Sequence, residues 1–148
     1  MGTAGLQVVE FPDPTLIATK LLGEWVGQPE GIKVASRLPH PIPDRFIRCF
    51  TIVGNDEANP RVASCQVIAR VYDTAGNEPR CARVANRVGS VLRSAPEVPG
   101  ETTEWISEPC KRQGPYPIQD PEVPNRVCYQ TIVTWTLHSY VTTVQQGG

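Results

Sequence analysis

The sequence contains few side chains that could act as an acid, a base or a nucleophile in catalysis. Its two histidines, His40 and His138, are the natural candidates for a general base, but neither forms part of a recognisable catalytic motif. His40 lies between Pro39 and Pro41 in a predicted exposed loop, and His138 alternates outward on the last predicted strand. We therefore interpret both as ordinary surface histidines.

Acidic residues that fall close together are better explained as turn residues than as a catalytic pair. Asp56 and Glu57 are adjacent in a predicted loop, where their side chains must splay apart, and Asp120 and Glu122 lie among prolines. The sequence also lacks the nucleophile-elbow, phosphate-loop, HExxH and dinucleotide-binding motifs. We therefore expect no catalytic, cofactor-binding or metal-binding residues, and we expect that the protein is not an enzyme.

Five cysteines are the remaining reactive side chains. They are odd in number and widely spaced, and no CxxC or CxH pair suggests a metal site. Two of them, Cys65 and Cys81, fall on apolar faces of a predicted strand and a predicted helix. We expect reduced thiols at all five positions, Cys49, Cys65, Cys81, Cys110 and Cys128, and we expect Cys65 and Cys81 to be buried.

The charge distribution offers one candidate for binding phosphates. The chain has 14 basic and 15 acidic residues, so no overall field attracts it to nucleic acid or to an anionic membrane. Locally, Arg80, Arg83 and Arg87 form a row on a predicted helix. This row fits phosphate recognition, but a solvated helix face explains it equally well and is the interpretation we favour. A salt-dependent affinity for DNA would reverse that preference.

Length and composition predict one globular domain. The chain has 148 residues, of which 40% are apolar and 20% are charged, as in ordinary globular proteins. We expect no membrane span and no secretory signal, because the apolar runs are short and the first residues lack the basic and apolar regions of a signal. We expect a single domain over residues 1–141, followed by a flexible tail over residues 142–148 that lacks periodic apolar content.

Two segments have helical periodicity. In residues 13–26, Asp13 is placed to cap the helix, Pro14 takes its first position and Gly27 ends it. In residues 80–94, an apolar arc lies opposite the arginine row. The apolar faces that we expect in the core comprise Ile17, Leu21, Leu22 and Trp25 in the first helix, and Cys81, Val84, Ala85, Val88, Val91 and Leu92 in the second.

Strand-like alternation accounts for most of the rest of the chain. It predicts strands over residues 31–37, 44–53, 61–72, 102–112 and 126–141, the second and third forming a hairpin around the turn at 54–60. The expected fold is therefore α+β, a small mainly antiparallel sheet of about five strands with two helices packed on one face. Sixteen residues of strand would reach about 50 Å, so part of the last strand should bend or meet another chain.

Two proline-rich stretches, residues 38–44 and 114–125, are predicted loops. Because proline fixes φ and lacks an N–H donor, both loops should be extended and stiff. A stiff projecting loop can hold a contact surface, and a small sheet has edges that need to be covered. These features favour a protein that works through assembly.

In order and texture, the sequence resembles the tail terminator proteins of long-tailed (siphovirus-type) bacteriophages that infect actinobacteria. The resemblance extends from Val8 to Val141 and rests on LPHPIPDRFIRCFTIVG, on VIARVYD leading into CARVANRVGSVL, and on GPYPIQDPEVPNRVCYQTIVTW. It implies a structural virion subunit without a cofactor, found in the tail–neck region after assembly in the host cytoplasm. Such a subunit forms a ring, commonly a hexamer, that caps the head-proximal end of the tail tube and stops its polymerisation.

The expected partners are other copies of the chain, the tail tube protein and a head–tail connector or head-completion protein. Genomic DNA would pass through the ring without sequence-specific binding. Head-to-tail contacts close into a ring when the rotation per subunit divides a full turn. We expect the contact surface on residues 39–45 and 112–124, which contain the proline-rich loops, and on the strand over residues 126–141. The candidate contact residues are Pro39, Pro41, Pro43, Arg45, Arg112, Tyr116, Ile118, Asp120, Glu122 and Arg126.

Three other functions remain open. A head-completion or connector protein of the neck would share the small size, the ring and the absence of catalytic motifs. A nucleic-acid-binding module would use the Arg80, Arg83 and Arg87 row, although it lacks the usual basic excess and stacking aromatics. A small enzyme with an unrecognised site is the third alternative.

Overall fold

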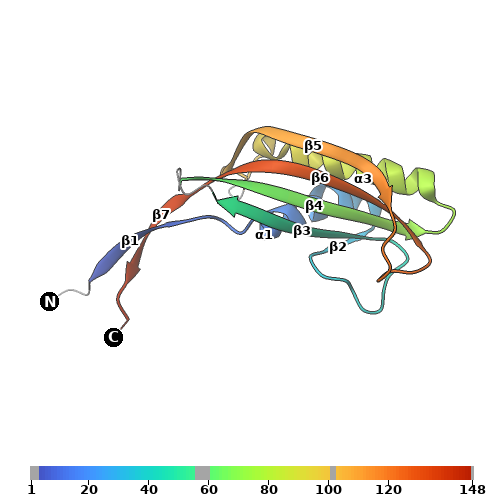
Figure 1. Ribbon diagram of the computed structural model, residues 1–148, viewed down its shortest axis with the longest axis horizontal. Helices are drawn as coiled ribbons and strands as arrows, with labels where there is room; N and C mark the ends of the chain where they lie inside the picture. The colour runs from blue at the N-terminus through green and yellow to red at the C-terminus, as the bar shows by residue number, and fades with distance from the viewer. Residues whose placement is uncertain (1–3, 56–60, 101–102, 148) are drawn as a thin grey trace.

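A five-stranded sheet, two main helices and a separate two-stranded ribbon make up the protein (Figure 1). The computed structural model describes residues 4–55, 61–100 and 103–147. The strands are β1 (Gly5–Glu10), β2 (Lys33–Ala35), β3 (Phe46–Asn55), β4 (Val62–Thr74), β5 (Ile106–Ile118), β6 (Arg126–His138) and β7 (Tyr140–Gln145). The helical segments are α1 (Pro14–Leu22), the π-helical turn η1 (Gly23–Gly27), α2 (Gln28–Glu30), α3 (Glu78–Arg93) and the 3₁₀ turn η2 (Ala95–Glu97).

The large sheet has the order β2-β3-β4-β6-β5 and is antiparallel except for the short β2–β3 pair. The predicted hairpin is confirmed as β3 and β4, which pair with Cys49 opposite Ala69. Most of its predicted turn, residues 56–60, lies outside the described residues. The prediction of an α+β fold with a mainly antiparallel sheet is therefore confirmed.

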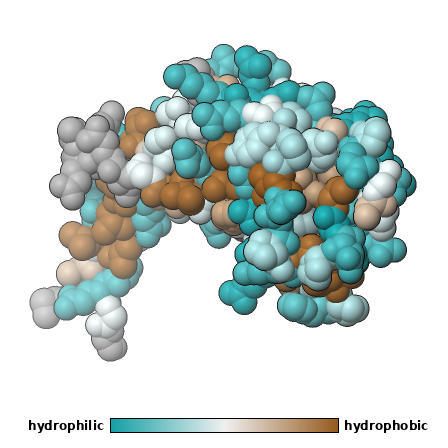
Figure 2. All heavy atoms as spheres, turned by 45° about the vertical axis from the view of Figure 1, so that its right-hand side comes forward, coloured by the Kyte–Doolittle hydropathy of each residue, from teal (hydrophilic) through white to brown (hydrophobic). Residues whose placement is uncertain are grey.

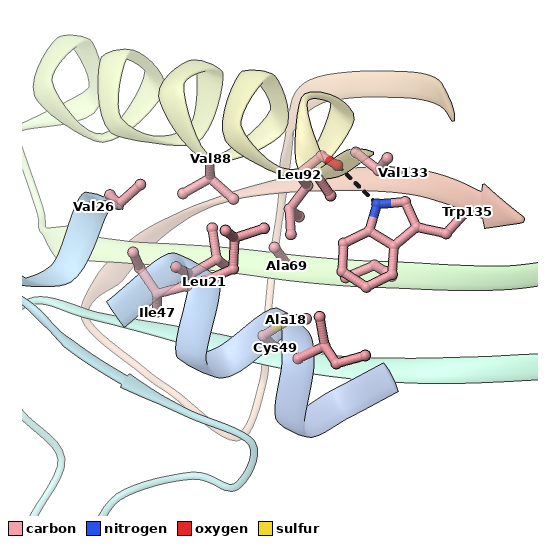
Figure 3. Close-up of a cluster of buried hydrophobic side chains, with 14 of the residues drawn as sticks. Ala18, Leu21, Val26, Ile47, Cys49, Ala69, Val88, Leu92, Val133 and Trp135 are labelled. Atoms are coloured by element: carbon pink, nitrogen blue, oxygen red, sulfur yellow. Dashed lines mark hydrogen bonds between the residues drawn. The ribbon is translucent and has the colours of Figure 1, made fainter. Parts of the chain in front are cut away.

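The main hydrophobic core joins α1 and α3 to alternate residues of the central strands (Figure 3). Along β4, Cys65, Val67 and Ala69 are fully buried, as the two-residue period predicts. The largest buried side chain, Trp135 of β6, donates from Nε1 to the Leu92 carbonyl oxygen at 2.7 Å. This bond satisfies the indole N–H inside the core and attaches the end of α3 to the sheet.

The first helix begins as predicted but does not end at Gly27. Asp13 Oδ1 accepts hydrogen bonds from the N–H groups of Thr15 and Leu16, at 3.0 and 3.3 Å, so the predicted cap is confirmed. The helical path then continues through η1 and α2, and it ends at Gly31, whose φ of 67° is left-handed. The π-helical turn changes the helical phase, and it leaves Trp25 51% exposed rather than in the core.

The space around Gly27 explains why a glycine stands there. A Cβ atom would lie 2.8 Å from the Ile32 carbonyl oxygen and 3.0 Å from Val34 Cγ2. The residue therefore allows β2 and the segment before it to approach the helix closely. Gly27 is therefore a glycine because of close packing, and not because it ends the helix in a left-handed conformation.

The second predicted proline-rich loop begins later than the sequence predicts. Residues 114–118 belong to β5, so Tyr116 and Ile118 lie in a strand and not in a loop, and Arg112 lies in the same strand. β5 is at the edge of the sheet, and its register against β6 shifts twice. An edge strand can hold prolines because one row of its backbone groups needs no partner strand, which is why the proline pattern was a misleading loop signal.

The long final alternation divides into two strands. β6 ends at His138, and β7 pairs with β1 in the separate ribbon, with Val9 opposite Val141 and Leu6 opposite Val144. The prediction that part of the segment must bend is confirmed. The prediction of a flexible tail from residue 142 is wrong for residues 142–145, because β1 supplies a partner that the sequence analysis does not identify.

Within the described ranges, no helix combines the length and the apolar content needed to cross a membrane.

Candidate assembly surfaces

Both proline-rich segments fold onto the sheet around a second, smaller core. This core contains Phe46, Tyr72, Val123 and Cys128, with Leu38, Ile42 and Ile118 packed against it. Phe46 and Tyr72 stack with their ring centroids 4.3 Å apart. The predicted contact loops are therefore anchored to the body of the protein by burial of their own apolar side chains.

The loop over residues 38–44 is also held by Arg126, at the start of β6. Arg126 Nε donates to the Pro43 carbonyl oxygen at 3.2 Å, and Nη2 donates to the Ile42 carbonyl oxygen at 3.5 Å. The same guanidinium lies 3.5 Å from Asp44 Oδ1. Arg126 thus positions this loop, in which Pro41 is exposed while Pro39 and Pro43 are half-buried.

The segment over residues 119–125 is held by Asp120. The Tyr72 hydroxyl donates to Asp120 Oδ2 at 2.6 Å, and the Glu122 N–H donates to Oδ1 at 3.0 Å. Burial, together with the bond to this carboxylate, raises the pKa of the Tyr72 phenol. Glu122 itself remains 68% exposed and lies 3.8 Å from Arg48.

Two further predicted contact residues on β5 bond within the subunit. Arg112 Nη1 donates to Ser90 Oγ at 2.9 Å and to the Asn86 carbonyl oxygen at 3.3 Å, which links β5 to α3. The Tyr116 hydroxyl accepts from Gln130 Nε2 at 2.7 Å, and its side chain is 37% exposed. These residues therefore stabilise the subunit, and their use in contacts between subunits stays a prediction.

The predicted arginine row is occupied by carboxylates of the same chain. Arg80 forms a two-point contact with Asp73, from Nε at 2.8 Å and from Nη2 at 2.6 Å. Arg83 donates twice to Glu30, at 2.8 and 3.1 Å, and Arg87 donates to the same carboxylate at 3.3 Å. These pairs join α3 to β4 and α2, so the row is partly neutralised on the folded protein.

A fourth arginine, Arg45, belongs to this charged cluster. Its guanidinium lies 3.4 Å from Asp73 Oδ2 and 3.9 Å from Glu30 Oε2. Burial tends to raise the pKa of Asp73, but bonds from Arg80 and the Thr74 N–H outweigh it and lower that pKa. The bond from Arg83 likewise lowers the pKa of Glu30. Both carboxylates are therefore held in the charged form.

The side chains with reactive chemistry do not converge in the described ranges. All five cysteines are free, as the sequence predicts, and all five are buried, whereas burial was predicted only for Cys65 and Cys81. Burial raises the pKa of Cys49, Cys65 and Cys128 to about 12, and that of Cys81 and Cys110 to about 11.

The histidines lie far apart in the fold. His138 Nε2 lies 2.6 Å from Ser107 Oγ, on neighbouring strands of the sheet, while His40 is exposed in the first proline-rich loop.

The acidic pair Asp56 and Glu57 lies outside the described residues. Among the described residues, no group of three or more His, Cys, Asp or Glu side chains is arranged to hold a metal ion.

The most prominent surface is the ribbon of β1 and β7, which we call the arm. It projects beyond the end of the five-stranded sheet, away from the helices (Figure 1). No residue of either strand belongs to the main or the smaller core. Four of its five aliphatic side chains are strongly exposed, with Leu6 at 66%, Val141 at 65%, Val9 at 48% and Val144 at 44%, and Val8 is half-buried. Figure 2 shows hydrophobic side chains along the arm and where it meets the body.

Both long edges of the arm are also open. Each of its strands pairs with the other, and no third strand lies beside them among the described residues. Residues 140–147 carry no charged side chain, and Glu10 is the only charged residue of β1. The strands predicted from the sequence do not include the arm beyond residues 140 and 141, although the β-branched residues of GLQVVE and YVTTVQ, without proline, were a usable signal.

No family model matches the sequence, and a search of curated proteins finds no match.

Proposed function

We propose that the protein is a tail terminator: a structural subunit that closes into a ring, most simply a hexamer, on the head-proximal end of a phage tail tube. The observation that carries the proposal is the arm, with four strongly exposed aliphatic side chains and two open strand edges. A two-stranded ribbon is at best marginally stable in water unless something packs on it. An assembled ring would supply that packing. The sequence resemblance is the reason for choosing this ring among others.

The mechanism is steric and needs no chemical step. The two proline-rich segments are rigid because each is fixed by a partly buried hydrogen bond, from Arg126 for one and to Asp120 for the other. Rigid surfaces can match the end of a tube on one face of the ring and differ from it on the other. Growth stops because the second face does not present another tube-like surface, and that face is left for the head connector.

The arrangement of layers also supports this proposal. We propose that α1 and α3 cover one face of the five-stranded sheet, since both contribute to the core built on Cys65, Val67 and Ala69. The proline-rich segments pack on Tyr72, which occupies the other alternation phase of β4. Each subunit would then present a helical surface and a loop-and-sheet surface to different neighbours.

A head-completion or connector protein of the neck remains the nearest alternative, because an assembling arm serves either ring. A nucleic-acid-binding module is less well supported, because Asp73 and Glu30 already occupy the arginine row. Catalysis by a small enzyme is also less well supported, because the described histidines and thiols do not converge.

Electron microscopy of the purified protein mixed separately with tail tubes and with portal-filled heads tests the proposal. We expect a ring at one end of each tube and tubes that no longer elongate when tube protein is added. Binding to heads with no effect on tubes would instead identify a head-completion protein. Binding to neither particle would contradict both neck functions.

A further inference from the structure

We propose that the arm of one copy adds to the open edge of β3 in the next copy. This inference rests on the proposed ring and names the two surfaces that would form its contact. The donor is the arm, beside whose two strands no third strand lies in the part of the chain that the structure describes. The acceptor is the outer edge of β3 from Cys49 to Gly54, which has no neighbouring strand among the described residues.

The acceptor edge is open because β2 is short. β2 pairs only with residues Phe46 to Arg48, and the remaining seven residues of β3 extend past it. Beyond β2, the first helix touches this edge through its side chains, with Thr15 Oγ1 2.6 Å from Thr51 Oγ1. Around the open backbone, Ile52 is 55% exposed, Val53 43% and Leu16 62%. The edge therefore combines open backbone groups with apolar side chains, as strand addition requires.

The opposite edge of the sheet is a poor acceptor. That edge is β5, in which Pro115 and Pro117 have no N–H to donate and two register shifts break the regular ladder. These features are typical of edge strands that avoid pairing with other chains. Of the two edges of the five-stranded sheet, β3 is the one without such protection over its described residues.

A second copy of this chain is the partner that fits these surfaces. Each copy carries one arm and one open β3 edge, which are different surfaces, so the contact is head-to-tail and repeats in a ring. The arm is largely uncharged and aliphatic, and so are Ile52, Val53 and Leu16 around the acceptor. The arm has twelve residues, about half of the 20–30 residues that a stable interface uses on each side. The arm would therefore form only part of the contact, and other surfaces of the two copies would complete it.

The double variant Ile52→Lys, Val53→Lys tests this contact, because lysines on an edge oppose strand addition. Native mass spectrometry, with and without tail tubes, should show the dissociation constant between subunits rising roughly 100-fold, about 2.7 kcal/mol. The control is Trp25→Lys, which places one lysine, half of the charge added by the double variant, at an exposed apolar residue on a different surface. We expect the control to assemble like the wild type.

Hydrogen exchange on the wild type tests the same contact without any variant. Assembly should protect amides in β3 residues 50–54 and in both strands of the arm. Protection of the arm without β3, or assembly of the double variant at wild-type strength, would overturn the inference and leave the proposed ring intact. Weaker assembly of Trp25→Lys alone would also overturn the inference, because the contact would then involve the surface around Trp25 and not β3. A wild type that stays monomeric even with tubes would overturn both.

Discussion

At the scale of single residues, burial explains most of the side chains that the sequence marks as reactive or charged. The five cysteines are inert core residues, and the arginines of α3 are tied to Asp73 and Glu30. The apolar alternation of β4 and the arc of α3 were sufficient to predict that Cys65 and Cys81 are buried. The carboxylate partners were not predictable, because Glu30 and Arg83 are 53 residues apart and meet only through the fold.

We expect the native protein to react very slowly with thiol reagents. With pKa values of about 11 to 12, roughly one thiol in a thousand or fewer is ionised at pH 8. A chromogenic disulfide reagent should label no more than a trace of thiol in buffer and all five thiols in denaturant. Rapid labelling of even one thiol in buffer would contradict the buried placement.

Asp73→Asn should destabilise the protein by about 2 to 3 kcal/mol, because it removes the charge that Arg80 and Arg45 contact around a buried side chain. Glu122→Gln, at an exposed ion pair, is the control and should change stability by less than about 0.5 kcal/mol. Urea unfolding at neutral pH measures both. Equal effects of the two substitutions would contradict the role assigned to Asp73.

The same carboxylates predict how stability depends on pH. The folded-state pKa values of Asp73 and Glu30 are lowered, so their contribution is fully present above the unfolded values of about 4. It is lost as the pH falls through the lower folded-state values, where the unfolded chain binds more protons. The stability difference between wild type and Asp73→Asn should therefore shrink below about pH 4.

At the scale of elements, local sequence signals located most helices and strands. The remaining boundaries depend on contacts between segments that are distant in the sequence. The Asp13 cap and the β3–β4 hairpin are determined by neighbours in sequence, so periodicity and capping predict them. The end of the first helix depends on how β2 packs against Gly27, and the extent of β5 depends on its place at a sheet edge. The β1–β7 pair joins the two ends of the chain, which no local pattern specifies.

Gly27→Ala should destabilise the protein by about 1 to 3 kcal/mol, because its Cβ would lie 2.8 Å from the Ile32 carbonyl oxygen. Gly23 is the matched control in the same π-helical turn, with no atom within 4 Å of an added Cβ. Gly23→Ala should be neutral or stabilising by up to about 1 kcal/mol. Thermal unfolding followed by circular dichroism separates the two, and a stabilising Gly27→Ala would show that β2 packs differently.

At the scale of the whole molecule, the sheet, helices and loops form a stable body, while the arm contributes exposed apolar surface without a core of its own. The sequence analysis expected the contact surface on the proline-rich loops, because stiffness is visible in a sequence. In the structure, those loops are anchored to the body of the protein, and four strongly exposed aliphatic side chains lie on the arm. Exposure depends on what packs nearby, and the sequence of a strand does not reveal that.

Leu6→Ser with Val144→Ser should separate assembly from folding. These side chains lie opposite each other on the arm and outside both cores, so the stability of the single subunit should change by less than about 0.5 kcal/mol. Association between subunits should weaken, because the exposed apolar surface of the arm is reduced. Ultracentrifugation measures the association, and urea unfolding measures the stability of the single chain. A variant that is less stable but associates normally would contradict the assignment of the arm to assembly.

The mass of the wild-type protein bound to tail tubes, measured by native mass spectrometry after its release, tests the central claim most directly. The ring proposed here predicts one discrete multiple of the 16.2 kDa subunit, six copies in the simplest case. A protein that remains a single subunit, both alone and with tubes, would contradict the claim that it functions as a ring.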